Sequence, residues 1–311
     1  ECIDDRAAAF QLFDQCKEWL EARGMEAMEG PINFGEKDKY WGLIVENFDA
    51  PPYYQQNYNP EYYVGFFRDY GFQTYYEQLI YFRDIRTQGL TQKFVERAQR
   101  LQQNPRFSVC RIDPKRLDKF GEDFRTIYNR AWAQSHRNFA EMSKPKAKAA
   151  MKAMKPILDR NLVYFAFYDE TPIGFFIGIP NINELFRKVG PNFNLIGKLK
   201  FLWYKWRTPP RTFIAVAFGI DPAYQGKGVE GLIFQLMEDH IYKPKWYTEF
   251  YLNWIGDFNP KIISIVEDLD TVLFRKMATM HKLFDPERPF ARRPINQQAT
   301  RKTGEQGTAK K

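Results

Sequence analysis

The sequence is poor in the residues that build disulfide frameworks and metal centres. Its 311 residues include three cysteines and three histidines, widely spaced along the chain. An odd number of separated cysteines does not make a disulfide framework, and none of these residues has the spacing of a zinc site. We therefore expect no metal and a reducing compartment, which assigns the protein to the cytoplasm.

Long hydrophobic runs are also missing. Apolar runs such as residues 213–220 are far shorter than the roughly 18–20 residues that a membrane span needs. We expect neither a signal peptide nor a transmembrane segment. Hydrophobic residues still make up 44% of the chain and aromatic residues 17%, so one large domain or two ordinary ones can bury a core.

Charge is unevenly distributed, although the net charge is +8. Residues 1–84 carry 7 Lys or Arg against 16 Asp or Glu, whereas residues 85–290 carry 33 against 21. A basic second part suits a phosphate-bearing ligand, because positive charge concentrates anions. A basic surface without a specific anion site is the alternative. Residues 291–311 are basic and almost free of large aliphatic side chains, so we predict disorder there.

Hydrophobic periodicity and turn residues predict alternating helices and strands. Helices are expected over residues 5–23, 60–70, 87–103, 117–134, 145–158, 228–241 and 259–269. Strands are expected over residues 26–33, 72–82, 107–112, 162–168, 172–179, 213–220, 247–254 and 272–283. Residues 181–210 form a mixed segment. The order helix, strand, Asn-Pro, helix, strand occurs around both Asn59 and Asn259, which indicates a weak internal repeat.

The most informative segment is the turn after residues 213–220, which reads Gln225-Gly226-Lys227-Gly228-Val229. Glycines between a strand and a helix let several backbone N–H groups point at one anion, and the helix N-terminus adds its partial positive charge. The turn lacks the pattern of a Rossmann or a Walker loop. An ordinary strand-to-helix turn is the alternative.

With this turn, residues 107–283 resemble the GNAT superfamily of N-acyltransferases in the order of their elements. The resemblance implies an α/β fold, acetyl-CoA or another acyl-CoA as co-substrate, and a small-molecule or peptide amine as acceptor. The pyrophosphate loop of that family, Arg/Gln-x-x-Gly-x-Gly/Ala, matches at Gln225 and Gly228. Glu230 stands where glycine or alanine is usual, and its carboxylate opposes a pyrophosphate unless it points away.

The resemblance also implies which residues contact the coenzyme. In the family, the strand before the loop pairs with the pantetheine arm, and the loop and a later helix-opening Asn approach the coenzyme. The corresponding residues are Phe218, Gly219, Ile220, Gln225, Gly226, Lys227, Gly228, Val229 and Asn259. The tyrosine that the family often places seven residues after that Asn is absent, since Val266 stands there.

Catalytic residues are expected on the strand that follows the helix. Glu249 and Tyr251 are two residues apart and share one face of that strand. Acyl transfer to an amine needs a base for the ammonium and an acid for the leaving thiolate, and these two side chains are the candidates. An ordinary acid at a strand edge is the alternative for Glu249.

The first part of the chain resembles the C-terminal half of a second such domain, as in a group of uncharacterised bacterial tandem-GNAT proteins. The resemblance is carried by residues 22–25, 30–35 and 58–63. Its early strands are then expected upstream of Glu1. The residues before its first helix, Asp4-Asp5-Arg6-Ala7, contain no glycine loop, so this half is expected to bind no coenzyme.

We therefore expect a tandem GNAT-like protein with mixed central sheets flanked by helices. The expected division is a degenerate half over residues 1–84, a helical linker over 85–106, a complete domain with the coenzyme loop over 107–290 and the tail.

Aromatic residues concentrate at residues 40–82, which hold 16 of them. Trp41, Tyr53 and Tyr58 are candidates for the wall of a substrate pocket, and an interface between the two halves is the alternative. Residues 144–160 are basic, and residues 198–211 interleave basic with aromatic side chains. Both segments are candidates for RNA or membrane contact, and a solvated face is the alternative.

Taken together, these features predict an acyl-CoA-dependent N-acyltransferase. A non-catalytic binding or scaffold protein of the same fold is one alternative. A transferase that uses aminoacyl-tRNA is another, although a nucleic-acid partner is not favoured.

Overall fold

The computed structural model describes residues 2–35, 40–86, 89–133, 141–242 and 246–296. The strands are β1 (Ala27–Gly30), β2 (Leu43–Ile44), β3 (Gln73–Asp84), β4 (Phe107–Arg111), β5 (Val163–Tyr168), β6 (Thr171–Pro180), β7 (Thr212–Ile220), β8 (Glu249–Gly256) and β9 (Val272–Leu283). The helices are α1 (Arg6–Glu21), α2 (Tyr62–Asp69), α3 (Gln92–Gln102), α4 (Leu117–Ala133), α5 (Lys144–Met154), α6 (Asn183–Val189), α7 (Leu195–Arg207), α8 (Val229–Met237) and α9 (Pro260–Asp268). The predicted element order is confirmed, and the mixed segment at residues 181–210 holds the helices α6 and α7.

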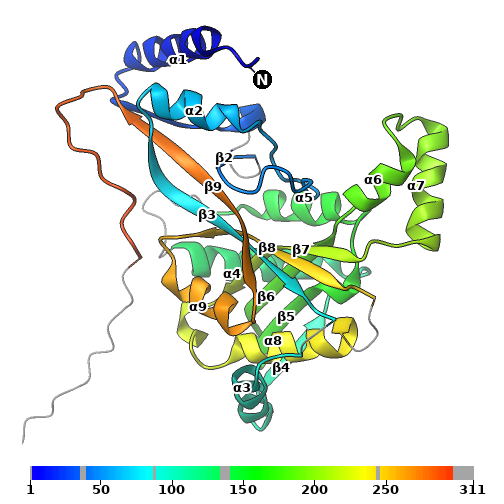
Figure 1. Cartoon of the computed structure of the whole chain (residues 1–311). Coiled ribbons are helices and arrows are strands. Elements are labelled where there is room, and N and C mark those ends of the chain that lie inside the picture. The colour runs from blue at the N-terminus through cyan, green and yellow to red at the C-terminus, as the bar shows by residue number, and fades with distance from the viewer. Residues whose placement is uncertain (1, 36–39, 87–88, 134–140, 243–245, 297–311) are drawn as a thin grey trace, which may run out of the picture.

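The described strands form one mixed sheet in the order β1–β9–β3–β8–β7–β6–β5–β4, with β2 paired to β9 (Figure 1). Strand β3 comes from the first part of the chain, yet it lies between β8 and β9 of the second part and is antiparallel to both. The first part therefore completes the sheet of the second part. The division of the chain into two halves and a linker stays a prediction.

Helices cover both faces of the sheet because its central strands are apolar on both faces. In β5, Tyr164 and Ala166 pack into the cluster that holds α3, α8 and α9. Their neighbours Val163 and Phe165 pack into the cluster that holds α4 and α5. Successive side chains of a strand point to opposite faces, so this alternation sets the two helix layers.

The C-terminal segment differs from its prediction. Disorder was expected over residues 291–311, but residues 291–296 lie against the body of the protein. Arg292 forms an ion pair with Asp257 at 2.5 Å. The backbone N–H of Asn296 donates to the carbonyl oxygen of Phe258 at 2.8 Å. These polar contacts hold a segment that has few apolar side chains, and residues 297–311 lie outside the described residues.

Helix α3, the predicted linker helix, crosses α8 at Gly231. A Cβ atom on Gly231 would lie 3.0 Å from the carbonyl oxygen of Phe94 and 3.1 Å from the backbone nitrogen of Ala98. The helices therefore approach closely only because this residue has no side chain. Buried Phe94 and Phe234 meet beside the crossing, with ring centroids 5.5 Å apart.

Replacing Gly231 with alanine is expected to lower the free energy of unfolding by about 1–3 kcal/mol, because the added methyl group forces the two helices apart. The matched control is Gly65→Ala in α2, where a Cβ atom would meet nothing within 4 Å. That control should raise stability by about 0.5–1 kcal/mol through helix propensity. Urea denaturation of the two variants measures both effects, and equal stabilities would contradict the tight crossing.

Candidate active site

Strands β7 and β8 open into a wedge, and this is the feature of the sheet that could hold a ligand. They pair in parallel from Thr212 opposite Glu249 to Ala215 opposite Leu252. No further β7–β8 pair forms among the described residues. Beyond this point β8 pairs with β3 on its other side. The inner edges of residues 216–220 and 253–256 therefore have no strand partner in the described part of the chain, and the carbonyl oxygen of Ile220 accepts from the side chain of Gln225 at 3.1 Å.

Two backbone irregularities mark the wedge. The pairing of β6 with β7 shifts so that Val216 is an extra residue between Ala215 and Ala217, which is a β-bulge at the apex. On the opposite strand, Trp254 has a φ of 56°, in the left-handed region that a bulky residue rarely adopts. Such strain costs on the order of 1–3 kcal/mol and concentrates at functional sites.

Polar atoms without partners lie on the β8 side of the wedge. The side-chain oxygen of Asn253 and the indole nitrogen of Trp254 are buried and have no hydrogen-bond partner among the described residues. Buried polar groups are normally satisfied, and each exception asks for an explanation.

The glycine turn follows β7 at the open end of the wedge. Gly226 and Gly228 have φ values of 71° and 98°, which glycine adopts without strain. Asp221 accepts hydrogen bonds from the backbone of Ala223 and from Arg130, so the start of the turn is fixed. Asn259 caps α9 by accepting from the backbone of Ile262, and it lies beyond the end of β8.

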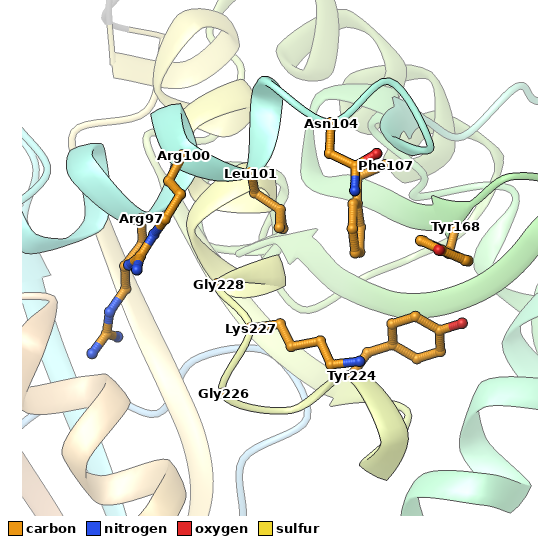
Figure 2. Close-up of a pocket in the computed structure, with 10 residues that line it drawn as sticks. All are labelled: Arg97, Arg100, Leu101, Asn104, Phe107, Tyr168, Tyr224, Gly226, Lys227 and Gly228. Atoms are coloured by element: carbon orange, nitrogen blue, oxygen red, sulfur yellow. The ribbon is translucent and has the colours of Figure 1, made fainter.

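A cavity of about 500 Å³ lies against the turn. Figure 2 shows Arg97 and Arg100 of α3 on one side of it and aromatic rings on the other. The lining residues are Arg97, Arg100, Leu101, Asn104, Phe107, Tyr168, Tyr224, Gly226, Lys227 and Gly228. The ammonium group of Lys227 sits 4.7 Å from the centre of the Tyr224 ring. Three cations and three aromatic rings suit a phosphate joined to a flat ring system.

Glu230 points into the helix packing. Its carboxylate is buried and lies 3.4 Å from the guanidinium of Arg97, and Asp268 lies 3.9 Å from the same group. It is therefore paired with a cation on α3. The backbone of Arg97 also stands over Gly228, since a Cβ there would lie 3.3 Å from the Arg97 carbonyl oxygen. The backbone of α3 thus fills part of the space beside Gly228 that the missing side chain leaves open.

On the other face of the sheet, the apex of the wedge meets an aromatic cluster. Val216 and Tyr251 pack into the cluster that contains Tyr53 and Ile214. The rings of Tyr53 and Tyr251 stack, with centroids 5.2 Å apart. Burial, and then the Glu249 carboxylate, raise the pKa of Tyr251. Burial also raises the pKa of Tyr53, whose hydroxyl has no hydrogen-bond partner among the described residues.

A buried arginine holds the loop that carries Tyr53. The Arg275 side chain is 1% exposed. Its guanidinium donates to the carbonyl oxygens of Asn47 and Ala50 and to the side-chain oxygen of Gln56. Burial lowers the pKa of Arg275, because desolvation disfavours the charged guanidinium. These hydrogen bonds from the Arg275 guanidinium hold residues 47–56 beside the apex of the wedge.

The structure brings together only some of the predicted site residues. Residues 218–220 form one lip of the wedge, the turn residues follow them, and Tyr251 and Tyr53 meet at the apex. Glu249 lies at the paired end of β8 beside Thr212, about 13 Å along β7 from Val216. Trp41 forms a β-bridge with Ile32 and lies edge-on to Tyr76, and Tyr58 is exposed.

Six further residues lie at the site and are not predicted from the sequence. They are Arg97, Arg100, Val216, Asn253, Trp254 and Arg275. The basic residues of the predicted linker helix are visible in the sequence, and they could have indicated Arg97 and Arg100. The bulge, the left-handed tryptophan and the buried arginine depend on strand pairing, which local patterns do not contain.

Two curated proteins are similar to this chain in sequence. No family model matches the chain. The curated relative Protein YghO of Escherichia coli K12 is 21% identical over 289 residues, covering 91% of this chain and 72% of that protein. The bacterial ceramide synthase of Caulobacter vibrioides is 28% identical over 273 residues, covering 86% of this chain and 69% of that protein.

Two solved structures resemble the chain in fold. A GCN5-related glucosamine N-acetyltransferase region of a fungal multi-domain β-N-acetylglucosaminidase matches with a TM-score of 0.51 at 12% identity, over 88% of this chain and 27% of that one. A GCN5-related N-acetyltransferase from Sphaerobacter thermophilus matches with a TM-score of 0.50 at 9% identity, over 89% of this chain and 68% of that one. The predicted fold is confirmed: the chain has the fold of the GNAT superfamily.

Proposed function

We propose that this chain is an N-acyltransferase that moves an acyl group from an acyl-CoA thioester to an amine. The observation that carries the proposal is the opening of β7 and β8 after Ala215 and Leu252, in a chain with the GNAT fold. Free strand edges bind an extended, amide-containing ligand as a further strand would bind. The pantetheine arm of an acyl-CoA has this character.

The phosphate end of the coenzyme suits the cavity at the glycine turn. Arg100 and Lys227 supply positive charge there, and Tyr168 and Tyr224 supply flat rings. The pairing of Glu230 with Arg97 removes much of the repulsion that the sequence suggested. When bound, the coenzyme would supply an activated acyl group, and the chain would orient that group toward Val216.

The reaction requires the ammonium nitrogen to lose two protons, one before it attacks and one afterwards, and the sulfur to gain one. The amine nitrogen forms a bond to the thioester carbonyl carbon, and the carbon–sulfur bond breaks. Tyr251 beside the apex suits the donor of the proton to the leaving thiolate, because a phenol is protonated at neutral pH and burial raises the pKa of Tyr251 further. Glu249 remains a candidate acceptor of the ammonium proton only through intervening water, given its distance from the apex.

The acceptor that we propose is a long-chain amino alcohol, and the donor a long-chain acyl-CoA. The Caulobacter relative is named a bacterial ceramide synthase, and a ceramide is the amide of a fatty acid with such an amine. The apolar and aromatic cluster at the apex, with Tyr53, Ile214 and Phe274, suits a lipid chain.

The test is an assay of the purified full chain with palmitoyl-CoA and sphinganine, with acetyl-CoA run in parallel. Mass spectrometry should detect the N-acyl product, and a thiol reagent should detect an equal amount of free coenzyme A. Thiol release without an amide product would contradict the acceptor. No thiol release with any acyl-CoA would contradict the enzyme.

Reversing two charges of the cavity tests the place of the coenzyme. The double variant Arg100→Glu, Lys227→Glu is expected to raise the KM for acyl-CoA at least about tenfold, since contacts to charged groups contribute about 1.5–3 kcal/mol each. Both side chains are exposed, so the fold should survive. Arg68→Glu on α2, another exposed arginine, is the control and should leave KM unchanged. Equal KM values in all three proteins would place the phosphates elsewhere.

A second candidate function is a non-catalytic binding protein of the same fold. The specific observation in its favour is the backbone of Arg97 over Gly228. If α3 stays in that position, a coenzyme cannot reach the turn as it does in the family. Saturating acyl-CoA would then leave the melting temperature unchanged, whereas a ligand of the native state must raise it.

A further inference from the structure

Helices α6 and α7 form a hairpin that projects from the body of the protein (Figure 1). Its inside is held by the aromatic rings of Phe186, Phe193 and Phe201, whose centroids lie 5.4–5.8 Å apart. Lys188 closes its base by donating to the hydroxyl of Thr208 at 2.9 Å. The hairpin is therefore an ordered structure, and its outer surface is fixed.

That outer surface is apolar to an unusual degree. Six large apolar side chains of α7 are between 54% and 78% exposed. They are Leu195, Ile196, Leu199, Leu202, Trp203 and Trp206. At 3.6 residues per turn they occupy one arc of about 120°, away from the face that carries Gly197 and Phe201 and packs inside the hairpin. Contiguous exposed apolar surface of this kind marks an interaction site.

Positive charge borders the apolar arc on both sides. By helical position, Lys198 and Lys205 lie on one flank, and Lys200 and Arg207 lie on the other. Residues 187–211 contain seven Lys or Arg and no Asp or Glu. An apolar stripe with tryptophans between two basic borders is the pattern of a helix that lies in the surface of a bilayer.

We propose that α7 is an in-plane membrane helix that seats this protein on an anionic lipid bilayer. The apolar arc enters the boundary between headgroups and acyl chains, and the flanking lysines contact anionic headgroups. This mode needs no spanning segment, and no described helix is long and apolar enough to cross a bilayer. The proposal does not depend on the acyl transfer proposed above.

Charge favours a bilayer over other occupants of this surface. A second copy of α7 would bring its own basic borders against those of the first, and like charges repel. An RNA strand would find basic residues but would leave Leu195, Ile196, Leu199 and Leu202 without bases to contact, because aliphatic side chains do not stack on bases as rings do. An anionic bilayer satisfies both the lysines and the aliphatic residues.

The experiment is flotation of the full chain with vesicles made of equal parts of phosphatidylcholine and phosphatidylglycerol. Vesicles of phosphatidylcholine alone are run beside them, at low salt and at ~1 M salt, where charges are screened beyond about 3 Å. We expect binding to the anionic vesicles at low salt and at least about tenfold weaker binding in the other conditions.

Two pairs of matched variants separate α7 from apolar exposure in general. Leu199→Ser with Trp206→Ser should lower vesicle binding at least about tenfold. Leu12→Ser with Trp19→Ser on α1 is the control, because it changes the same residue types at the same spacing and similar exposure. Helix α1 carries three acids and two bases, so this control should bind like the wild type. Lys198→Glu with Lys200→Glu should remove the preference for anionic vesicles.

Two results would overturn the proposal. They are no binding of the folded wild type to anionic vesicles, or an equal loss in the α1 control. A wild-type dimer that the α7 variant converts to a monomer, without vesicle binding, would assign the surface to a second copy. RNA binding that depends on α7, again without vesicle binding, would assign it to a nucleic acid.

Discussion

Tyr251→Phe should lower kcat for acyl transfer by two orders of magnitude or more, with little change in the KM for acyl-CoA. General acid catalysis contributes about 10²–10⁴-fold, and the variant removes only the hydroxyl oxygen. The phenylalanine ring can keep the stack on Tyr53 and the contact with Phe274. Steady-state kinetics with saturating amine measure the effect, and a circular dichroism spectrum checks the fold.

The control for this variant is Tyr247→Phe. Tyr247 also precedes the wedge and is buried, but its hydroxyl donates to Asp159 at 2.8 Å, away from the apex. Its removal should cost about 1 kcal/mol of stability and leave kcat unchanged. An unchanged kcat in Tyr251→Phe would contradict the role of Tyr251 as a proton donor.

The pH profile gives the same prediction a second readout. A donor must be protonated, and the pKa of Tyr251 is raised above its usual value near 10. Activity that depends on this phenol is therefore fully present below pH ~10 and is lost only as the pH rises through the raised pKa. A fall in kcat between pH 7 and pH 9 would have to come from another group.

Arg275→Leu is expected to lower the free energy of unfolding by about 3 kcal/mol. Three oxygen atoms, on Asn47, Ala50 and Gln56, lose their donor, and a buried polar atom left unpaired costs about 1–3 kcal/mol. Part of the loss is offset because leucine no longer buries a charge. Urea denaturation of the variant measures the difference as a shift of the midpoint.

Two further variants test this account of Arg275. Arg275→Lys keeps the charge but has a single nitrogen, so it should fall between the wild type and Arg275→Leu. Arg68→Leu on the surface of α2 should change stability by no more than about 0.5 kcal/mol. Wild-type stability in Arg275→Leu would mean that residues 47–56 hold their position without the guanidinium.

The elements of the fold could be predicted because their signals are local. In β5, alternate residues face opposite helix layers, and a run of six partly or fully buried residues reads directly as a strand covered on both faces. The glycines of the turn and the helix cap at Asn259 are local signals too. These local signals predict the positions of β7, α8 and α9, and the structure has the three elements there.

What could not be predicted depends on contacts between distant segments. An apolar strand such as β3 could pair with many partners, and nothing in its own pattern selects the place between β8 and β9. Arg275 lies in a strand where a charged residue usually indicates a solvent-facing position. Only the loop at residues 47–56, more than 200 residues away in sequence, supplies its acceptors.

The candidate site residues also divide into those that local signals predict and those whose position depends on strand register. The resemblance to the GNAT superfamily implies residues 218–220 as coenzyme contacts, and these residues lie on the lip of the wedge. Glu249 was inferred from the shared face of its strand, but parallel pairing places it at the closed end. Whether a residue on the correct face lies at the correct end of a strand depends on the register, which the periodicity of side chains does not fix.

Hydrogen exchange with and without palmitoyl-CoA tests most directly whether the acyl donor lies in the wedge. If the pantetheine arm pairs with the free edges, backbone N–H groups in residues 216–220 and 253–256 should exchange at least about tenfold more slowly when the ligand is bound. Strand β1, at the opposite edge of the sheet from the cavity, should be unchanged. Slower exchange confined to α3, or no change in either strand edge at a saturating ligand concentration, would contradict the proposed site.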